Sequence, residues 1–283
     1  MRVGAHVGAS GGLTTAFERA QAIGAETIQI FGAPPQTWRR RNIRPEECEA
    51  FRARMAETGI EPVFLHGVYL INLATETPEQ LDKSTEALAG DQKLASALGA
   101  KGVIFHVGSH KGAGFARVLP QIAKALRKVL KETPDDALII LENSAGQGGS
   151  VGSKFAELGA IMGKVKSARL KVCVDTQHAF AAGYNLAERA GLDAAMEEFD
   201  REIGLEQLVA VHANDSKIAL GGGVDRHDNI GAGHIGKAGF AVIMAHAAFR
   251  DVPFLLEVPG FENEGPDKRN VDILKKIRAK VAR

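Results

Sequence analysis

The sequence predicts a single (β/α)8 (TIM) barrel that spans residues 1–283. Three observations favour this α/β fold. Short apolar runs alternate with helix-like segments about eight times. These runs lack polar–apolar alternation, as expected of parallel strands that are buried on both faces. Polar residues close most of the runs, and the active site of a parallel barrel lies at the C-terminal strand ends. A doubly wound open sheet is the alternative.

The candidate strands and helices follow one another along the chain. The strands, rich in Val, Ile, Leu and Phe, cover residues 2–6, 27–31, 62–66, 102–106, 138–142, 170–175, 208–212 and 254–257. The helical segments include residues 13–23, 45–58, 78–98, 115–131, 185–203, 237–249 and 267–281. Thr77-Pro78-Glu79-Gln80 predicts a helix start, with a capping Thr, Pro at the first helical position and Gln at the third. Gly24, Gly59 and Gly99 follow helices, as helix-ending glycines do.

Length and composition are ordinary for a globular protein. The 283 residues are 45% hydrophobic and 24% charged, with a formal net charge of +1. Near-neutrality does not exclude nucleic acid, since a local basic face suffices to bind it. Cys48 and Cys173 form no CxxC pair and fit a reduced compartment. Because no apolar run reaches the roughly 20 residues of a membrane span and no signal-peptide pattern is present, we expect a cytoplasmic protein without a membrane partner.

Nine side chains that can bind metal lie at strand ends or in the loops that follow. The strand-end residues are His66, His106, Glu142, Asp175, His212 and Glu257, and the loop residues are His178, Asp225 and His227. A single histidine at a strand end is usually structural. Six such ends are hard to explain by structure alone, because a buried charged group needs a partner. Nitrogen and oxygen ligands without cysteine suit zinc or manganese, and their number exceeds the need of one ion. The pattern predicts a multinuclear metallohydrolase.

Other candidate groups give weaker signals. His6 ends the first strand and is expected to support the ligands, while His110 could orient a ligand or meet a phosphate. His234 and His246 are expected to have no chemical role. Residues 231–236 satisfy G-x-G-x-x-G but follow a polar stretch instead of an apolar strand, so no dinucleotide-binding turn and no nucleotide cofactor are expected. These glycines should let a loop pass close to the metal ligands or to a phosphate.

Several sequence blocks resemble those of the endonuclease IV family of apurinic/apyrimidinic (AP) endonucleases. The blocks are HGVYLINLA, FHVGSH, LENSAGQG, VCVDTQHAFAAGY, HANDSK and DRHDNIGAGHIG, and the resemblance covers nearly the whole chain. It implies a barrel with three zinc ions per chain that cleaves double-stranded DNA on the 5′ side of an abasic site. The implied products are a 3′-hydroxyl and a 5′-deoxyribose phosphate.

The same resemblance implies how the ligands are shared. His66 and His106 would hold one zinc, with Glu142 bridging to a second zinc held by Asp175, His212 and Glu257. The third zinc would be held by His178, Asp225 and His227. Zinc lowers the pKa of bound water, which supplies a nucleophile at neutral pH. Glu142 and Glu257 are the expected catalytic carboxylates, since Glu257 could orient or deprotonate the attacking water. Asn143, Asn214 and Asp215 are candidate partners of the ligands.

The DNA contacts implied by the resemblance include Tyr69 and the loop after the second strand. The family commonly has Arg or another long polar residue before the Trp of this loop, whereas this chain has the shorter, neutral Gln36 and Thr37 after a stiff Pro34-Pro35. Arg39, Arg40 and Arg41 follow and could contact phosphates instead; the alternative is a solvated basic turn. The departure concerns damage recognition and not metal chemistry.

Two other functions fit parts of the pattern. Sugar isomerases and epimerases of the xylose-isomerase-like barrels also place His, Glu and Asp at strand ends, although typically for one or two ions. The additional ligands His178, Asp225 and His227 favour the nuclease over this alternative. A DNA-binding barrel without activity is the second alternative, which a complete ligand set disfavours. A monomer is the family expectation.

Overall fold

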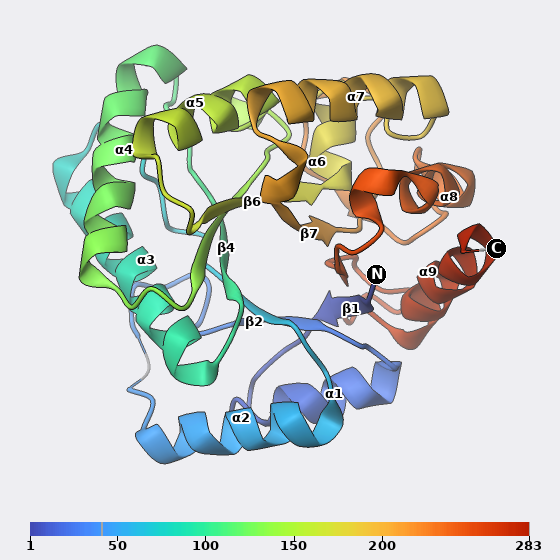
Figure 1. The fold of residues 1–283 in the computed structure, drawn as a ribbon, viewed down its shortest axis with the longest axis horizontal. Helices are drawn as coiled ribbons and strands as arrows, with labels where there is room; N and C mark the ends of the chain where they lie inside the picture. Colours follow the sequence, from blue (N-terminus) through green and yellow to red (C-terminus); the bar gives the residue numbers. More distant parts are fainter. Residues whose placement is uncertain (41, 283) are drawn as a thin grey trace.

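The structure, a computed structural model that describes residues 1–40 and 42–282, confirms the predicted barrel (Figure 1). Around the closed barrel the strands follow the order β1-β10-β7-β6-β5-β4-β3-β2, and each neighbouring pair is parallel. The strands are β1 (Val3–His6), β2 (Ile28–Phe31), β3 (Val63–His66), β4 (Gly102–His106), β5 (Leu138–Glu142), β6 (Leu170–Asp175), β7 (Leu208–His212) and β10 (Phe254–Leu256). Asp215–Ser216 (β8) and His227–Asp228 (β9) form a separate antiparallel pair.

The predicted strand bounds are nearly correct. Strands β4, β5, β6 and β7 have the predicted bounds, and each of the other four is one residue shorter at one end. Continuous apolar runs are informative here because both faces of a barrel strand are covered, one by the barrel interior and the other by the helices. The strand termini, on which the site depends, therefore follow directly from the sequence.

Helices form the outer ring of the barrel (Figure 1). They are α1 (Thr15–Ile23), α2 (Pro45–Thr58), α3 (Pro78–Leu98), α4 (Phe115–Glu132), α5 (Phe155–Val165), α7 (Arg189–Glu202), α8 (Gly236–Ala245) and α9 (Lys268–Val281). The short helix α6 (Thr176–Ala181) is instead buried at the C-terminal end of β6. Two predicted helices are too long. The helix predicted at 185–203 begins only at Arg189, and the one predicted at 237–249 ends at Ala245 and is followed by a separate 3-10 turn, Ala247–Phe249.

The expected helix ends are partly confirmed. Gly24, Gly59 and Gly99 end α1, α2 and α3 with positive φ angles of 73°, 65° and 67°, which glycine adopts without steric strain. Thr77 is the N-cap residue and Pro78 begins α3, as predicted, but the Thr77 side chain makes no capping hydrogen bond. The hydroxyl of Thr75 instead accepts from the Thr77 amide at 3.2 Å and donates to Gln80 Oε1 at 2.9 Å. Thr75, two residues before the N-cap position, therefore makes the side-chain hydrogen bonds at the start of α3.

Two layers of side chains fill the upper half of the barrel. The lower layer, called the apolar floor, consists of six fully buried residues: Phe64, Ile104, Ile140, Cys173, Ala210 and Leu255. Side chains two positions apart on a strand point to the same face. The residues two positions further on are His66, His106, Glu142, Asp175, His212 and Glu257. Together with His6 and Gln29, which contact Glu257, they form the polar layer.

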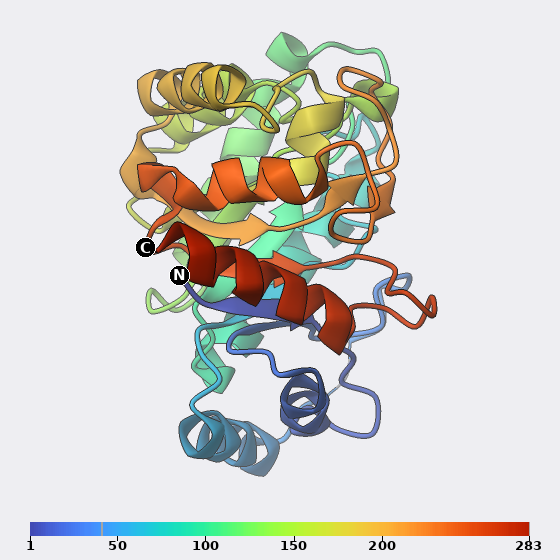
Figure 2. The ribbon, with the colours of Figure 1, turned by 90° about the vertical axis from the view of Figure 1, so that its right-hand side faces the viewer.

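The two chain ends lie side by side at the N-terminal face of the barrel, where α9 runs along the outside of β1 (Figure 2). Arg278 of α9 donates from Nη1 to the carbonyl oxygen of Met1 at 3.0 Å and pairs with both carboxylate oxygens of Glu26, at 2.6 and 2.9 Å. These contacts tie α9 to the residues that precede β1 and β2. Among residues 1–40 and 42–282, no helix combines the length and the apolar character needed to cross a lipid bilayer.

Candidate metal centre

The structure gathers the nine predicted ligands at the open end of the barrel. Eight of them form three groups, within each of which the ligand atoms lie within 4.8 Å of one another. The first group is His66, His106 and Glu142; the second is Glu142, Asp175, His212 and Glu257; and the third is Asp175, His178 and His227. The ninth, Asp225, places its carboxylate 3.3 Å from Nε2 of both His178 and His227. Asp175, expected in the second group alone, thus also reaches the third.

Glu142 lies at the centre of the cluster and is fully buried. Its Oε2 is 3.3 Å from His66 Nε2 and 3.6 Å from His106 Nε2, while its Oε1 is 2.9 Å from His212 Nδ1. Burial alone would raise the pKa of this carboxyl, but the charges of His106 and His212 and the hydrogen bonds around it hold the pKa well below its ordinary value. Glu142 is therefore an anion with one oxygen toward each of the first two groups.

Histidines and carboxylates of the cluster shift one another's pKa values. Burial lowers the pKa of His178, but the charge of Asp175 and the contacts with Asp225 and Glu142 outweigh it and raise the pKa well above its ordinary value. Burial would raise the pKa of Asp225, but contact with His178 outweighs it and lowers this pKa to about 2. The carboxylates therefore require positive charge nearby, which protons on histidine or metal ions can supply.

Asp175 positions His178 through local structure. It ends β6 and is also the N-cap of α6, where its Oδ1 accepts a hydrogen bond from the His178 amide at 2.9 Å. One turn of helix separates the two residues, so both side chains face the cluster. The D-x-x-H spacing of the sequence thus arises from a strand that passes directly into a short helix.

Three histidines direct the same ring nitrogen into the cluster. His66, His178 and His227 each place Nδ1 against a backbone carbonyl oxygen, at 2.7, 3.0 and 3.2 Å respectively. The Nδ1–H group can donate to that carbonyl, which leaves the lone pair on Nε2 for a metal ion. Nε2 of His178 and Nε2 of His227 are buried and make no hydrogen bond. Each nitrogen lies 3.3 Å from a carboxylate oxygen of Asp225 without forming a hydrogen bond to it, and this arrangement fits a site that holds a cation.

Gln29 contacts the cluster from β2 and was missed by the sequence analysis. Its side chain is fully buried, with Oε1 2.9 Å from His212 Nε2 and Nε2 2.6 Å from Glu257 Oε1. His6, expected to support the ligands, places Nδ1 3.2 Å from the same Glu257 oxygen. The available signal was a single amide within the apolar run TIQIF. Its inward direction becomes visible only once the strand register is known.

Two asparagines hold the ligands in place. Asn143 accepts from the Asp175 amide at 2.6 Å and donates to the Asp175 carbonyl at 3.1 Å. Asn214 donates to Asp175 Oδ2 at 2.7 Å and accepts from the Glu257 amide at 2.8 Å. Each side chain therefore links the cluster to the backbone of a neighbouring strand, as expected for a partner of a metal ligand.

Asp215, the third expected partner, has a different role. Its carboxylate accepts hydrogen bonds from the backbone amides of Gly231, Ile235 and Gly236, at 2.8, 2.9 and 3.1 Å. These amides belong to the G-x-G-x-x-G segment at the start of α8, where amides of this kind attract anions. The segment is thus closed around an internal carboxylate, in agreement with the expectation that it is no dinucleotide-binding turn.

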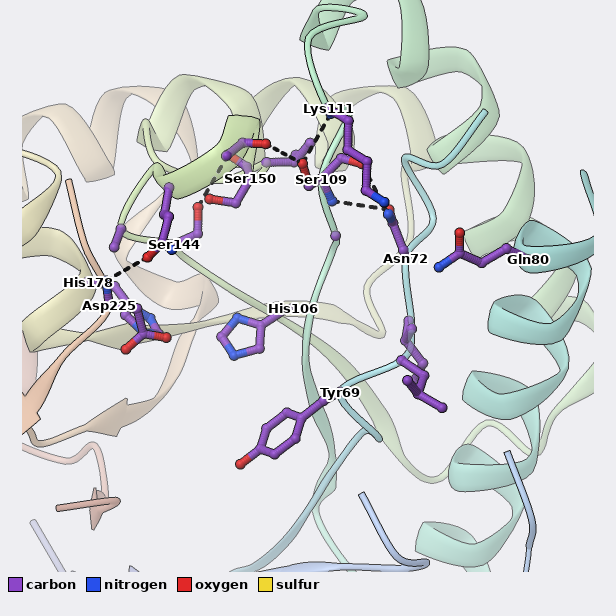
Figure 3. Close-up of a pocket in the computed structure, with 17 residues that line it drawn as sticks. Tyr69, Asn72, Gln80, His106, Ser109, Lys111, Ser144, Ser150, His178 and Asp225 are labelled. Atoms are coloured by element: carbon purple, nitrogen blue, oxygen red, sulfur yellow. Dashed lines mark hydrogen bonds and ion pairs between the residues drawn. The ribbon is translucent and has the colours of Figure 1, made fainter. Parts of the chain in front are cut away.

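A cavity of about 670 Å³ opens beside the first and third groups. His106 points into it between Tyr69 and Asp225, with Ser109 and Lys111 at its rim (Figure 3). Tyr69 is 59% exposed, and its ring meets those of Phe31 and His66 edge-on at centroid distances of 5.2 and 5.9 Å. An exposed aromatic ring held over a polar cavity can contact a ligand that enters it.

The loop after β2 also lies near this opening, since the Tyr69 amide donates to the Pro35 carbonyl at 2.9 Å. Gln36, Thr37 and Arg39 are exposed, as residues that contact a partner must be. Arg40 is exposed as well, but its Nη2 pairs with the buried carboxylate of Asp91 on α3 at 2.5 Å, so its guanidinium anchors the loop. Arg41 lies outside the described residues.

His110 holds its own loop in place, and the hypothesis that it orients a ligand or meets a phosphate stays a prediction. Its Nδ1 accepts hydrogen bonds from the amides of Gly112 and Gly114 at 3.1 and 3.2 Å. His234 is exposed, and His246 pairs with Asp193 at 3.4 Å on the outer surface. Neither contacts the cluster, as predicted.

Comparison with known proteins places this geometry in a family. Residues 17–277 match the family described as "Xylose isomerase-like TIM barrel". The "Probable endonuclease 4" of Halothermothrix orenii is 38% identical over 277 residues, which cover 98% of this chain and 100% of the relative. The crystal structure of endonuclease IV from Thermus thermophilus has a TM-score of 0.88 and 34% identity, and the match covers 99% of this chain and 100% of that one. A D-tagatose 3-epimerase-like protein has a TM-score of 0.76 at 19% identity, which is a likeness of fold alone.

The barrel and its polar layer therefore define a xylose isomerase-like TIM barrel. Sequence identity of 38% along nearly the whole chain identifies the family more specifically than a shared fold does. The chain belongs to the endonuclease IV family, which confirms the resemblance seen in its sequence blocks.

Proposed function

We propose that this protein is a zinc-dependent AP endonuclease that hydrolyses the phosphodiester on the 5′ side of an abasic site in double-stranded DNA. The expected products are a 3′-hydroxyl and a 5′-deoxyribose phosphate. The observation that carries the proposal is the convergence of nine His, Asp and Glu residues, eight of which form three overlapping groups, with the buried Glu142 shared by two of them. As a member of the endonuclease IV family, the chain is a hydrolase that cleaves DNA.

The residues present fit three zinc ions. Ligand atoms in the three groups are imidazole nitrogens and carboxylate oxygens, which zinc accepts readily. The Nε2 atoms of His178 and His227, buried beside the Asp225 carboxylate but without a hydrogen bond, also support a cation at the third group. In our proposal His66, His106 and Glu142 hold the first ion, and Glu142, Asp175, His212 and Glu257 hold the second. The third is held by His178, Asp225 and His227, with Asp175 close to it. When bound, such ions lower the pKa of water and neutralise the charge of a phosphodiester.

The two glutamates have different tasks because their exposure differs. Glu142 is fully buried and serves to join the first two groups, whereas the side chain of Glu257 is 17% exposed and can be reached from the opening. Burial would raise the pKa of Glu257, but His212 and other histidines outweigh it and hold this pKa well below the ordinary value. An ionised Glu257 held by His6 and Gln29 can accept a hydrogen bond from the attacking water and orient it.

The cavity beside the first and third groups suits an abasic nucleotide taken out of the duplex. Removing such a nucleotide is easiest where no base is paired. Tyr69 at the opening could fill the space left in the stack, while Gln36, Thr37 and Arg39 on the neighbouring loop could contact the backbone. A duplex that spans this opening would place its scissile phosphate over the polar layer. We expect one chain to suffice, and the monomeric state and the cytoplasmic location remain predictions.

The test uses a duplex with one tetrahydrofuran abasic analogue and the same duplex without it. Zinc-loaded protein should make a single nick 5′ to the analogue, with a 3′ end that a DNA polymerase can extend, and should leave the intact duplex uncut. Elemental analysis should give about three zinc ions per chain. One ion or fewer, with no nick, would favour the isomerase or epimerase alternative. Binding of the abasic duplex without a nick, at full zinc content, would favour a barrel without activity.

A further inference from the structure

We propose that Gln29 is a positioning residue that selects the nitrogen with which His212 binds metal and fixes the direction of Glu257. Neither task follows from the ligand set itself. The inference rests on the proposed function, because it assumes an ion at the second group. Its basis is the hydrogen bonding of one fully buried amide that bridges two ligands from different strands.

The orientation of the Gln29 amide is determined by Glu257. An amide nitrogen only donates hydrogen bonds, an amide oxygen only accepts them, and an ionised carboxylate only accepts. The nitrogen of Gln29 therefore faces Glu257 Oε1, at 2.6 Å. This leaves the amide oxygen 2.9 Å from His212 Nε2. Because that oxygen can only accept, Nε2 of His212 must carry the hydrogen.

The other nitrogen of His212 is then the metal ligand. A neutral imidazole with its hydrogen on Nε2 has its free lone pair on Nδ1. That atom lies 2.9 Å from Glu142 Oε1 and 3.3 Å from Glu257 Oε2. A lone pair facing two carboxylate oxygens is repulsive, so a proton or a metal ion must lie between Nδ1 and these oxygens, and a bound ion takes the place of the proton. Gln29 thus directs His212 Nδ1 to the point where the second group can hold its ion.

His212 differs in this respect from three other histidines of the cluster. His66, His178 and His227 present Nε2 to the cluster, and their Nδ1 atoms are held by backbone carbonyl oxygens. A side-chain substitution does not remove a backbone carbonyl. The Nε2 atom of His212 is held by a side chain instead, so its orientation depends on the identity of residue 29.

The amide is also fixed against rotation. The Gln29 oxygen faces only His212, whereas its nitrogen faces Glu257 Oε1 at 2.6 Å and also lies 2.9 Å from Nδ1 of His6. Turning the amide by half a rotation would place its oxygen against Glu257 and its nitrogen against His212, which would lose both bonds and bring two acceptors together. Gln29 therefore holds one rotamer and transmits it to two ligands.

The first experiment compares Gln29→Met with Gln92→Met. Methionine keeps the length of the side chain but removes its hydrogen-bonding groups. Gln92 is an equally buried amide on α3, and it donates to the Leu138 carbonyl at 2.8 Å, away from the ligands. Loss of a partner of this kind weakens metal binding by about 10- to 100-fold. We expect Gln29→Met to release one of its zinc ions at a chelator concentration at which wild type and Gln92→Met keep theirs. Equal zinc retention by the folded Gln29→Met variant would overturn the proposal.

The second experiment needs no variant and so also covers a Gln29→Met protein that fails to fold. In zinc-loaded wild type, ¹⁵N chemical shifts of the imidazoles should show His212 protonated at Nε2, and His66, His178 and His227 protonated at Nδ1. A His212 ring protonated at Nδ1 would overturn the proposal. The two levels of inference fail differently: wild type without zinc and without nicking refutes the proposed function. Zinc-loaded, active wild type with the wrong His212 tautomer refutes only the role of Gln29.

Discussion

Replacing Glu142 with Gln tests the centre of the proposed site most directly. Glutamine has nearly the same shape, so the fold should persist while one negative charge is lost. The lost carboxylate lies 2.9–3.6 Å from His66, His106 and His212. Removing one partner of a buried ion pair costs about 3–5 kcal/mol. At about 1.4 kcal/mol for each factor of ten, zinc affinity at the first two groups should fall by roughly 100- to 4000-fold.

The assay measures zinc content after graded chelation and the initial rate of nicking at an abasic analogue, at equal protein concentrations. Glu86→Gln, a change of the same chemistry at an exposed position on α3, is the matched control and should behave as wild type. Glu142→Gln should retain no more than about one ion and nick at a rate near background. A variant that keeps its full zinc content and nicks within about threefold of wild type would refute the assignment of Glu142 as the shared ligand.

Four further predictions concern two residues of the loop after β2, acid stability and the metal. Arg40→Ala should lower the free energy of unfolding by about 1–3 kcal/mol, since it leaves the carboxylate of Asp91 buried without its partner; urea unfolding measures this, and no change would contradict the anchoring role. Arg39→Ala should instead leave the free energy of unfolding within about 0.5 kcal/mol of wild type. It should reduce the slope of log binding constant against log salt concentration for the abasic duplex by about 1. An unchanged slope and affinity would make Arg39 part of a solvated turn. Burial would raise the pKa of Glu26, but pairing with Arg278 outweighs it and lowers this pKa from 4.5 to about 2; because the folded-state pKa is depressed, the stabilisation is complete above pH 4.5 and lost as pH falls toward 2. Glu26→Gln should therefore be less stable than wild type at neutral pH, with a difference that shrinks through this window, and a pH-independent difference would count against the pairing. Nicking should survive brief exposure to EDTA, because many protein ligands hold each ion; immediate loss that Mg²⁺ alone restores would exclude the zinc mechanism.

The strand ends could be predicted from the sequence because the pattern that marks them lies within a few consecutive residues. A polar residue that closes an apolar run, as at His66 or Glu142, must lie at the barrel opening or be paired. Period-2 geometry then brings such residues to one level, above the apolar floor. The ligand His178 was also visible from its D-x-x-H spacing, although it was expected in a loop and lies one helical turn into α6.

The remaining features depend on contacts between distant parts of the chain. Gln29 lies 183 positions from His212, and its inward direction follows from the register of β2 with its neighbours. Arg40, one of three consecutive arginines, was a candidate for a phosphate contact. Its internal partner, Asp91 on α3, is distant in sequence, and no local pattern reveals it. The Thr77 cap was a correct local pattern that Thr75 and Gln80 override. Sequence patterns identify which groups are available, and tertiary contacts decide where each is used.

The apolar floor has a consequence for the order of events in solution. Six fully buried side chains close the barrel beneath the polar layer, so ions, water and DNA all share a single entrance. We therefore expect zinc to load before DNA binds, and a bound duplex to seal the ions in. An incised product that dissociates slowly would then block this entrance. Chelators should therefore remove zinc from the free protein faster than from the DNA-bound form. Zinc exchange would thus report on the time each cleaved duplex spends on the protein.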